Sequence, residues 1–231
     1  MSFNPSFGID RAAAVTRGAM DRVYLWMTAG LLLTGAVAVG VANSPELQAL
    51  IFGNGVILIG LIVAQFGIVI GLTWLIQRIS APVATALFLL YAALTGLTLS
   101  SVFLAYTSAS VATTFFVTAG AFAGLSAFGY LTKRDLSGIG RFLVMALIGL
   151  LLATVANFFL RNSGLTLVLT YLGVLIFAGL TAYDTQRIKT MMADVQGEEG
   201  IQRMAIYGAL TLYLDFINLF LYLLRILGDR R

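Results

Sequence analysis

The feature that most constrains this chain is a series of seven long apolar runs. Each run can cross about 30 Å of hydrocarbon as a helix that rises about 1.5 Å per residue. The runs are 23–42, 50–77, 82–106, 110–131, 139–160, 165–187 and 204–227. The second run is long enough that we expect a single tilted helix. The sequence therefore predicts an all-α polytopic membrane protein with seven transmembrane helices.

Composition supports this prediction. Hydrophobic residues make up 60% of the 231 residues and charged residues 10%, whereas a soluble domain carries about 25% charged residues. Such a chain has too few charged residues to form the surface of a soluble domain, so its main partner is the lipid bilayer. The net charge of +4 does not indicate nucleic acid, because the basic residues are scattered at the ends of apolar runs.

The sequence contains neither cysteine nor histidine. Disulfides, haem ligation through Cys or His, the HExxH zinc helix and a Ser–His dyad are therefore excluded. We expect no cofactor, no resident metal and no enzymatic activity. Any titrating switch has to be built from Asp and Glu.

We divide the chain into a cytoplasmic N-terminal segment, 1–21, and a single transmembrane domain, 22–231. The first apolar run is expected to remain uncleaved, because its leader is long and carries Asp10 and Asp21. The polar loop 194–203 carries Asp194, Glu198 and Glu199, which we interpret as solvated acids.

Basic residues predict the topology. With the N-terminus in the cytoplasm and seven spans, ten basic residues fall on inner segments and four on outer ones. If the last segment is re-entrant instead, thirteen fall inside and one outside. The continuous apolar run 204–227 favours seven spans, and the re-entrant alternative stays open.

The last run contains a carboxylate, Asp215, near its middle. One helical face of this run carries Gly208, Thr211, Asp215, Asn218 and Tyr222. An ionisable group at bilayer depth costs about 2.5–3.5 kcal/mol, so it normally faces protein or water and marks an ion or proton path. The alternative is a simple hydrogen bond to Asn157, a threonine or a tyrosine.

A second carboxylate, Asp184, lies near the inner end of the sixth run, with Thr181 one turn earlier. A short loop joins the sixth and seventh runs, so they should be antiparallel neighbours. Both carboxylates then lie about 12 Å from the inner edge and can meet. Two such groups should share one proton near neutral pH, and its loss favours helix separation or entry of a cation.

Other polar residues have simpler interpretations. Arg78 is a candidate latch that pairs with Asp184, or only a topology signal. Asn54, Gln65 and Asn157 are expected to join helices by hydrogen bonds.

Four segments carry a family resemblance: ALTLYLDFINLFLYLLRILG at 209–228, GLTAYDTQRIK at 179–189, LTGLTLSSVF at 94–103 and TKRDLSG at 132–138. They resemble the Bax inhibitor-1 family, and more closely its bacterial inner-membrane branch. The resemblance implies that the C-terminal helix is central and surrounded by the other six. It also implies a pH-sensitive Ca²⁺ leak gated by a di-aspartyl pair, which falls on Asp184 and Asp215, with a latch arginine near Arg78. A pore-lining glutamate of some relatives has no counterpart, since the second run offers only Gln65.

Three functions remain open. The first is a cation leak channel with Ca²⁺ as the transported ion, in the bacterial inner membrane. The second is a non-transporting regulator that binds a membrane-bound protease or another membrane partner, a role described for some relatives. The third is an intramembrane aspartyl protease, which Leu212, Tyr213 and Leu214 disfavour because that class has Gly-x-Gly before its second aspartate.

Overall fold

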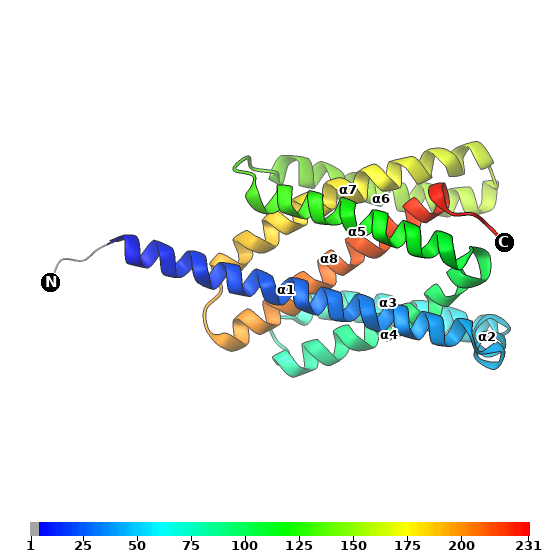
Figure 1. The fold of residues 1–231 in the computed structure, drawn as a ribbon, viewed down its shortest axis with the longest axis horizontal. Helices are drawn as coiled ribbons and strands as arrows, with labels where there is room; N and C mark the ends of the chain where they lie inside the picture. Colours follow the sequence, from blue (N-terminus) through cyan, green and yellow to red (C-terminus); the bar gives the residue numbers. More distant parts are fainter. Residues whose placement is uncertain (1–4) are drawn as a thin grey trace. The chain divides into compact units, whose positions relative to one another are not determined.

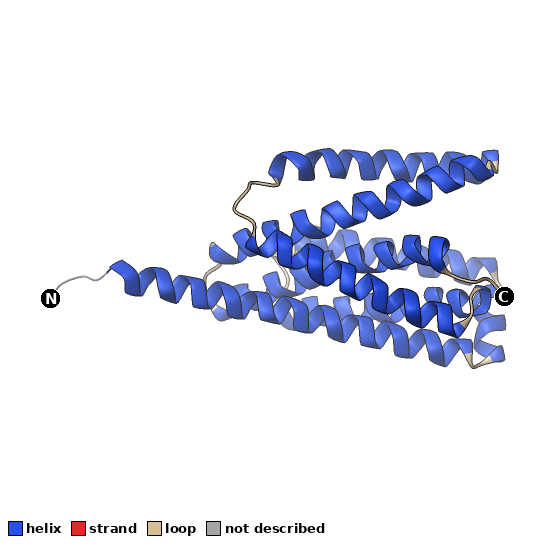
Figure 2. Cartoon of the chain, turned by 45° about the horizontal axis from the view of Figure 1, so that its top comes forward, coloured by secondary structure: helices blue, strands red, loops and turns tan. Residues whose placement is uncertain are grey.

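The computed structural model describes the backbone of residues 5–231 and the side chains of residues 16–231. Within this range every regular element is an α-helix (Figure 1; Figure 2). The helices are α1 (Pro5–Ala42), α2 (Pro45–Phe52), α3 (Gly55–Leu75), α4 (Ala81–Ala105), α5 (Ser108–Leu131), α6 (Ser137–Leu160), α7 (Ser163–Ala193) and α8 (Glu198–Leu227). Residues 1–4, which belong to the predicted segment 1–21, lie outside the described residues.

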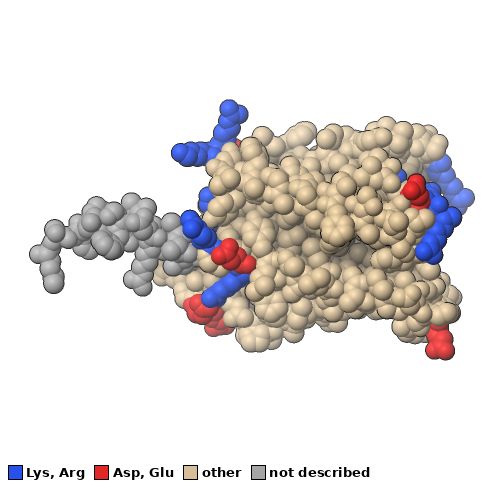
Figure 3. All heavy atoms as spheres, viewed as in Figure 1, with Lys and Arg blue, Asp and Glu red and all other residues tan. Residues whose placement is uncertain are grey.

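Seven of the helices described between residues 16 and 231 are long and apolar enough to cross a bilayer. They confirm the predicted all-α, seven-span class. α8 runs without interruption for 30 residues, so nothing in it provides the bend that a re-entrant segment needs. The face drawn in Figure 3 shows Lys, Arg, Asp and Glu at the helix ends, with uncharged surface between them, as lipid contact requires.

The second apolar run does not form the single long helix that we predicted. It is divided into α2 and α3 at Gly53 and Asn54. The Asn54 side chain accepts a hydrogen bond from the Val56 N–H at 3.0 Å and caps α3. Asn54 is therefore a helix cap, and its predicted role in joining helices was wrong. Asparagine competes well for such N-cap positions, which the apolar pattern does not reveal.

Two other boundaries differ from the prediction. α1 begins at Pro5, so most of the segment predicted as a polar leader is helical, with proline at a position that the first helical turn tolerates. α8 begins at Glu198, inside the predicted acidic loop. Glu198 forms an ion pair with Arg22 of α1. Acidic side chains in the first turn also stabilise a helix, because they interact favourably with the positive end of its dipole.

The chain divides into two compact units, and the first comprises Met1–Ala105 with Ile188–Tyr213. Its core includes a close contact between α1 and α4. The Thr34 hydroxyl donates to the Ala92 carbonyl at 2.8 Å, and a Cβ on Gly96 would lie 2.7 Å from the Thr34 carbonyl oxygen. Small residues permit this approach of two backbones, which stabilises helix pairs in membranes.

The second unit comprises Tyr106–Arg187 with Leu214–Arg231. It contains α5, α6, most of α7 and the second part of α8. Its apolar core is formed by Leu150, Leu169, Ile176, Phe177, Leu180 and Leu219. At the end of α8, the Ser110 hydroxyl accepts a hydrogen bond from the Asp229 N–H at 3.0 Å, which fixes the C-terminal turn against α5.

The α1–α4 contact generates a stability prediction. Gly96→Ala should destabilise the protein by about 1–3 kcal/mol, because the added methyl group overpacks the contact with α1. Gly35→Ala, in α1, is the matched control, since a Cβ there meets nothing within 4 Å. Thermal unfolding of both variants in detergent tests this. Equal unfolding temperatures would show that the two helices are not in tight contact.

Candidate functional site

Asp215 lies in α8 and is 4% exposed. Its Oδ2 atom has no hydrogen-bond partner among the described residues. The next residue, Phe216, packs against Phe115 and Phe122 of α5, with ring centroids 5.4 and 5.5 Å apart. Buried polar atoms are rarely left unpaired, because the loss of solvation is not recovered. A proton, a water molecule or a cation is therefore expected at this oxygen.

Asp184 lies in α7 and is 8% exposed. Arg187, one turn later, places its Nη1 atom 3.9 Å from Asp184 Oδ1. The arginine side chain is 47% exposed, so this long ion pair is a weak one. Asp184 therefore has a nearby positive charge without being firmly bound by it.

Two glycines bring α5 and α6 against α7 immediately before Asp184. A Cβ on Gly129 would collide with the Ala182 carbonyl oxygen, and a Cβ on Gly140 would collide with the Tyr183 ring. Larger residues would therefore push these helices apart. The glycines set the position of the α7 turn that carries Asp184.

The two carboxyl groups, Asp184 and Asp215, interact electrostatically within the second unit. They come from the last two helices, α7 and α8, and their predicted equal depth in the membrane stays a prediction. Two neighbouring carboxylates in a low-dielectric site strongly disfavour simultaneous ionisation, and such a pair titrates as a unit. The arrangement can hold and release one proton, or attract a cation when it is doubly charged.

A stripe of hydroxyl groups on α5 was missed by the sequence analysis. It consists of Ser110, Thr114, Thr118 and Ser126, all buried. Ser126 Oγ lies 2.9 Å from Thr185 Oγ1, one residue beyond Asp184, whereas Thr114 Oγ1 has no partner among the described residues. The signal was present in the sequence, because these residues recur at multiples of four along an apolar helix.

Three of the predicted supporting residues bond back to their own helices. Thr181, Thr211 and Asn218 donate to the carbonyl groups of Phe177, Tyr207 and Leu214 at 2.8, 3.0 and 2.8 Å. Each of these side chains thus has a hydrogen-bond partner within its own helix. Thr211 belongs to the first unit, and Thr181 and Asn218 belong to the second.

The remaining predicted residues have varied surroundings. Tyr222 stacks on Phe177 with ring centroids 5.8 Å apart. Asn157 Nδ2 donates to Thr166 Oγ1 at 2.7 Å, so it joins α6 to α7 as expected. Arg78 is exposed just after α3, in the first unit, and its pairing with Asp184 stays a prediction.

A polar network around Tyr213 in the first unit was also missed. The Thr34 hydroxyl donates to Ala92, so it accepts from the Tyr213 hydroxyl at 2.7 Å. In the same unit, the Thr95 hydroxyl donates to Gln65 Oε1 at 3.4 Å. Gln65 thus joins α3 to α4, as predicted. This network differs from the carboxylate pair, because its buried hydroxyl groups have partners.

Gln186 of α7 holds the loop between α5 and α6. Its Oε1 accepts from the Leu136 N–H at 2.9 Å, and its Nε2 donates to the Arg134 carbonyl at 2.8 Å. Within the loop, hydrogen bonds from the hydroxyl and N–H groups of Ser137 hold the pKa of Asp135 below its usual range. An ordered loop therefore covers α7 two residues beyond Asp184.

The site offers few ligands for a tightly held metal. Among the described residues, no group of three or more His, Cys, Asp or Glu side chains is arranged to bind a metal ion. Ca²⁺ takes six to eight oxygen ligands, and the pair supplies at most four. This chemistry suits proton exchange or transient cation binding.

The fold and the paired acids define a polytopic α-helical membrane protein with a carboxylate pair buried between its last two helices. The sequence profile of the family described as "Inhibitor of apoptosis-promoting Bax1" matches residues 16–231. The chain is 58% identical to the inner membrane protein YbhL of Escherichia coli K12, over 92% of both chains. It is also 47% identical to a protein of Borreliella burgdorferi over 92% of both chains, and 35% identical to YrjE of Lactococcus lactis over 90% and 89%. The chain belongs to the Bax inhibitor-1 family.

The hydrogen bonds that Asp135 accepts from Ser137 generate a pH prediction. Because its pKa is lowered in the folded state, Asp135 stabilises the fold at neutral pH, and this contribution is lost as the pH falls through its lowered pKa. Asp135→Asn should therefore reduce the unfolding temperature slightly at pH 7 and have no effect at strongly acidic pH. Asp194→Asn, in another exposed loop, is the control. A difference from wild type that persists at acidic pH would contradict the prediction.

Proposed function

We propose that the chain is a pH-sensitive cation leak channel that conducts Ca²⁺ and is gated by protonation of Asp184 and Asp215. The observation that carries the proposal is the buried carboxylate pair, in which Asp215 Oδ2 has no partner among the described residues. Intramembrane acids normally serve ion or proton paths, because their burial is otherwise unfavourable. The E. coli relative supports a location in the bacterial inner membrane, since its name describes an inner membrane protein.

The gating mechanism follows from charge. With one shared proton, the pair carries a single negative charge and the two helices can remain close. When that proton leaves, two negative charges face each other where water screens poorly. Repulsion then favours a rearrangement in which the carboxylates separate or a divalent cation enters between them. Arg187 lowers this repulsion in part, because it lies 3.9 Å from Asp184.

The hydroxyl stripe of α5 supports a path beside the pair. Its hydroxyl oxygens can replace part of the hydration of a passing cation, as backbone and side-chain oxygens do in other channels. The stripe is interrupted at Phe122, whose ring packs on Phe216. This aromatic contact closes the apolar side of the site.

Calcium flux into proteoliposomes tests the proposal. Wild-type flux should rise as the pH is raised through the titration of the pair. Asp215→Asn and Asp184→Asn should remove this response, because a neutral amide cannot release the proton. Asp194→Asn, which changes an exposed loop acid, should retain it.

Other results would reject the proposal. An unchanged pH response in Asp215→Asn would exclude gating by the pair. Absence of flux from the pure protein, together with co-purification of a membrane-bound protease, would favour the regulatory function. Cleavage of a peptide bond that is lost in Asp184→Asn would favour an aspartyl protease.

We also propose that the N-terminus is cytoplasmic and the C-terminus external. Because the chain has no cysteine, single introduced cysteines report topology without background. In intact cells, a membrane-impermeant maleimide should label Arg231→Cys and should not label Glu199→Cys in the first turn of α8. The reverse pattern would show the opposite orientation, and labelling of neither would place the C-terminus inside.

A further inference from the structure

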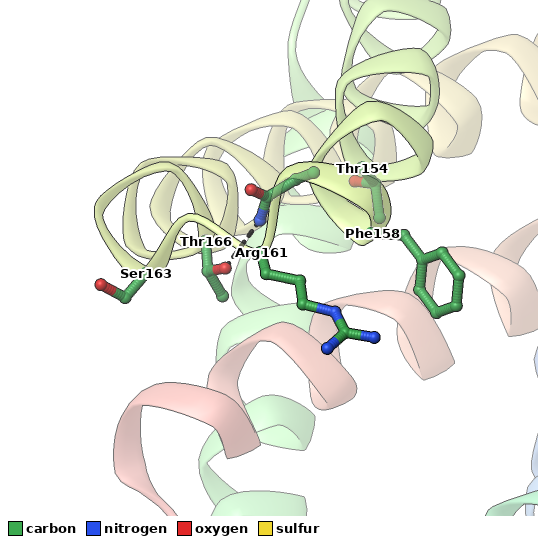
Figure 4. A pocket seen from close by; sticks show the side chains of 6 residues that line it. Thr154, Phe158, Arg161, Ser163 and Thr166 are labelled. Carbon is green, nitrogen blue, oxygen red and sulfur yellow. Dashed lines mark hydrogen bonds between the residues drawn. The ribbon is translucent and has the colours of Figure 1, made fainter.

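A pocket of about 570 Å³ lies at the turn between α6 and α7. It is lined by Thr154, Asn157, Phe158, Arg161, Ser163 and Thr166 (Figure 4). Since α6 and α7 are both membrane-spanning in length, their connecting turn lies at a membrane surface. The pocket therefore opens where lipid phosphate groups are concentrated.

The walls of the pocket are held by hydrogen bonds within the protein. Asn157 donates to Thr166 Oγ1 at 2.7 Å and accepts from the Asn162 N–H at 3.1 Å. Asn162 in turn accepts from the Leu165 N–H at 2.9 Å, and Thr154 donates to the Leu150 carbonyl at 2.7 Å. The pocket is thus formed before any ligand arrives, which lowers the entropy that binding would lose.

Arg161 occupies an unusual backbone position in this turn. Its φ is +52°, in the left-handed region, and its N–H donates to the Asn157 carbonyl at 2.8 Å. This end-of-helix position usually carries glycine, because a Cβ is unfavourable there. The presence of arginine with this backbone strain points to a role for its side chain.

The donor that remains free is suited to an anion. Among the described residues, the guanidinium of Arg161 has neither a hydrogen bond nor an ion pair, and it points to the Phe158 side of the pocket, whereas the Ser163 hydroxyl points to the opposite side (Figure 4). The sequence from Leu136 to Tyr183 contains no acidic residue, so neither α6 nor that part of α7 neutralises Arg161. A planar guanidinium binds phosphate through two parallel hydrogen bonds, which favours phosphate over a simple counter-ion.

The adjoining surface of α6 is strongly apolar. Phe158 lines the pocket and is 76% exposed. Phe159, Leu152 and Leu160 on the same helix are also largely exposed, as expected for residues that face hydrocarbon chains. A ligand that carries both a phosphate and acyl chains would therefore contact the basic pocket and the apolar surface together.

We propose that this pocket binds an anionic phospholipid, with its phosphate on Arg161 and its acyl chain along Phe158. The guanidinium supplies the charge and the paired donors. An anionic headgroup is favoured over a zwitterionic one, because no acid of α6 or the adjoining part of α7 is available to pair with a headgroup amine. The site is independent of the carboxylate pair.

The experiment measures lipid binding by the purified full-length chain after removal of native lipid. Binding is measured by native mass spectrometry, and the unfolding temperature is measured in parallel. Both are recorded with phosphatidylglycerol, phosphatidylcholine or inorganic phosphate. Wild type should bind phosphatidylglycerol at least tenfold more tightly than phosphatidylcholine. Arg161→Gly should reduce that affinity at least tenfold, whereas Ser163→Ala should leave it unchanged, because that hydroxyl points away from the guanidinium.

The choice of glycine keeps the experiment decisive. Glycine adopts the left-handed backbone more easily than arginine, so Arg161→Gly should fold at least as well as wild type while losing the guanidinium. Arg231→Gln, at the exposed C-terminus, is the matched loss of one positive charge and should bind phosphatidylglycerol as wild type does. Unchanged binding in Arg161→Gly, or an equal loss in Arg231→Gln, would overturn the proposal. Inorganic phosphate that binds as tightly as phosphatidylglycerol would overturn the lipid assignment.

Discussion

A hydrocarbon environment offers no hydrogen-bond partner, and this constraint governs every polar atom between the ends of the helices. The backbone meets it by forming helices throughout the described spans. Most hydroxyl groups meet it by donating to a carbonyl of their own helix, as Thr118 does to Thr114 at 2.7 Å. A carboxylate cannot use this solution, because it has no proton to donate. Asp215 is therefore the polar group for which this constraint matters most.

The contrast between Tyr213 and Asp215 shows how different two neighbouring polar groups on α8 can be. Tyr213 is completely buried, and its hydroxyl meets Thr34 at 2.7 Å within a network that joins several helices of the first unit. Asp215, two residues later, has an oxygen without a partner among the described residues. A hydrogen-bonded network in which every polar group has a partner makes the structure around it rigid. A buried polar group without a partner raises the free energy of the conformation that contains it, so a conformational change that supplies a partner is favoured. One helix thus carries both an anchoring group and a titratable one.

Charged groups at the helix ends follow a different rule, because water and lipid headgroups are available there. Arg22 pairs with Glu198, and Arg225 and Arg230 lie over the rings of Tyr222 and Tyr106. Arg161, in the α6–α7 turn, has no such partner among the described residues. The interior acids and this basic turn therefore offer two separate sites with opposite charge preferences.

The sequence by itself determined the seven spans and the family, because apolar run length and long sequence motifs are local properties. Several features were decided only by the tertiary structure. The division of run 50–77 depended on Asn54 capping a helix, and the hydroxyl groups of α5 gained meaning only when Ser126 met Thr185. The close approach of Gly129 to Ala182 is a contact between residues far apart in the chain. Periodicity gives the face of a helix, but which helix meets that face depends on packing, and this is why the surroundings of Asp184 could not be derived from its own segment.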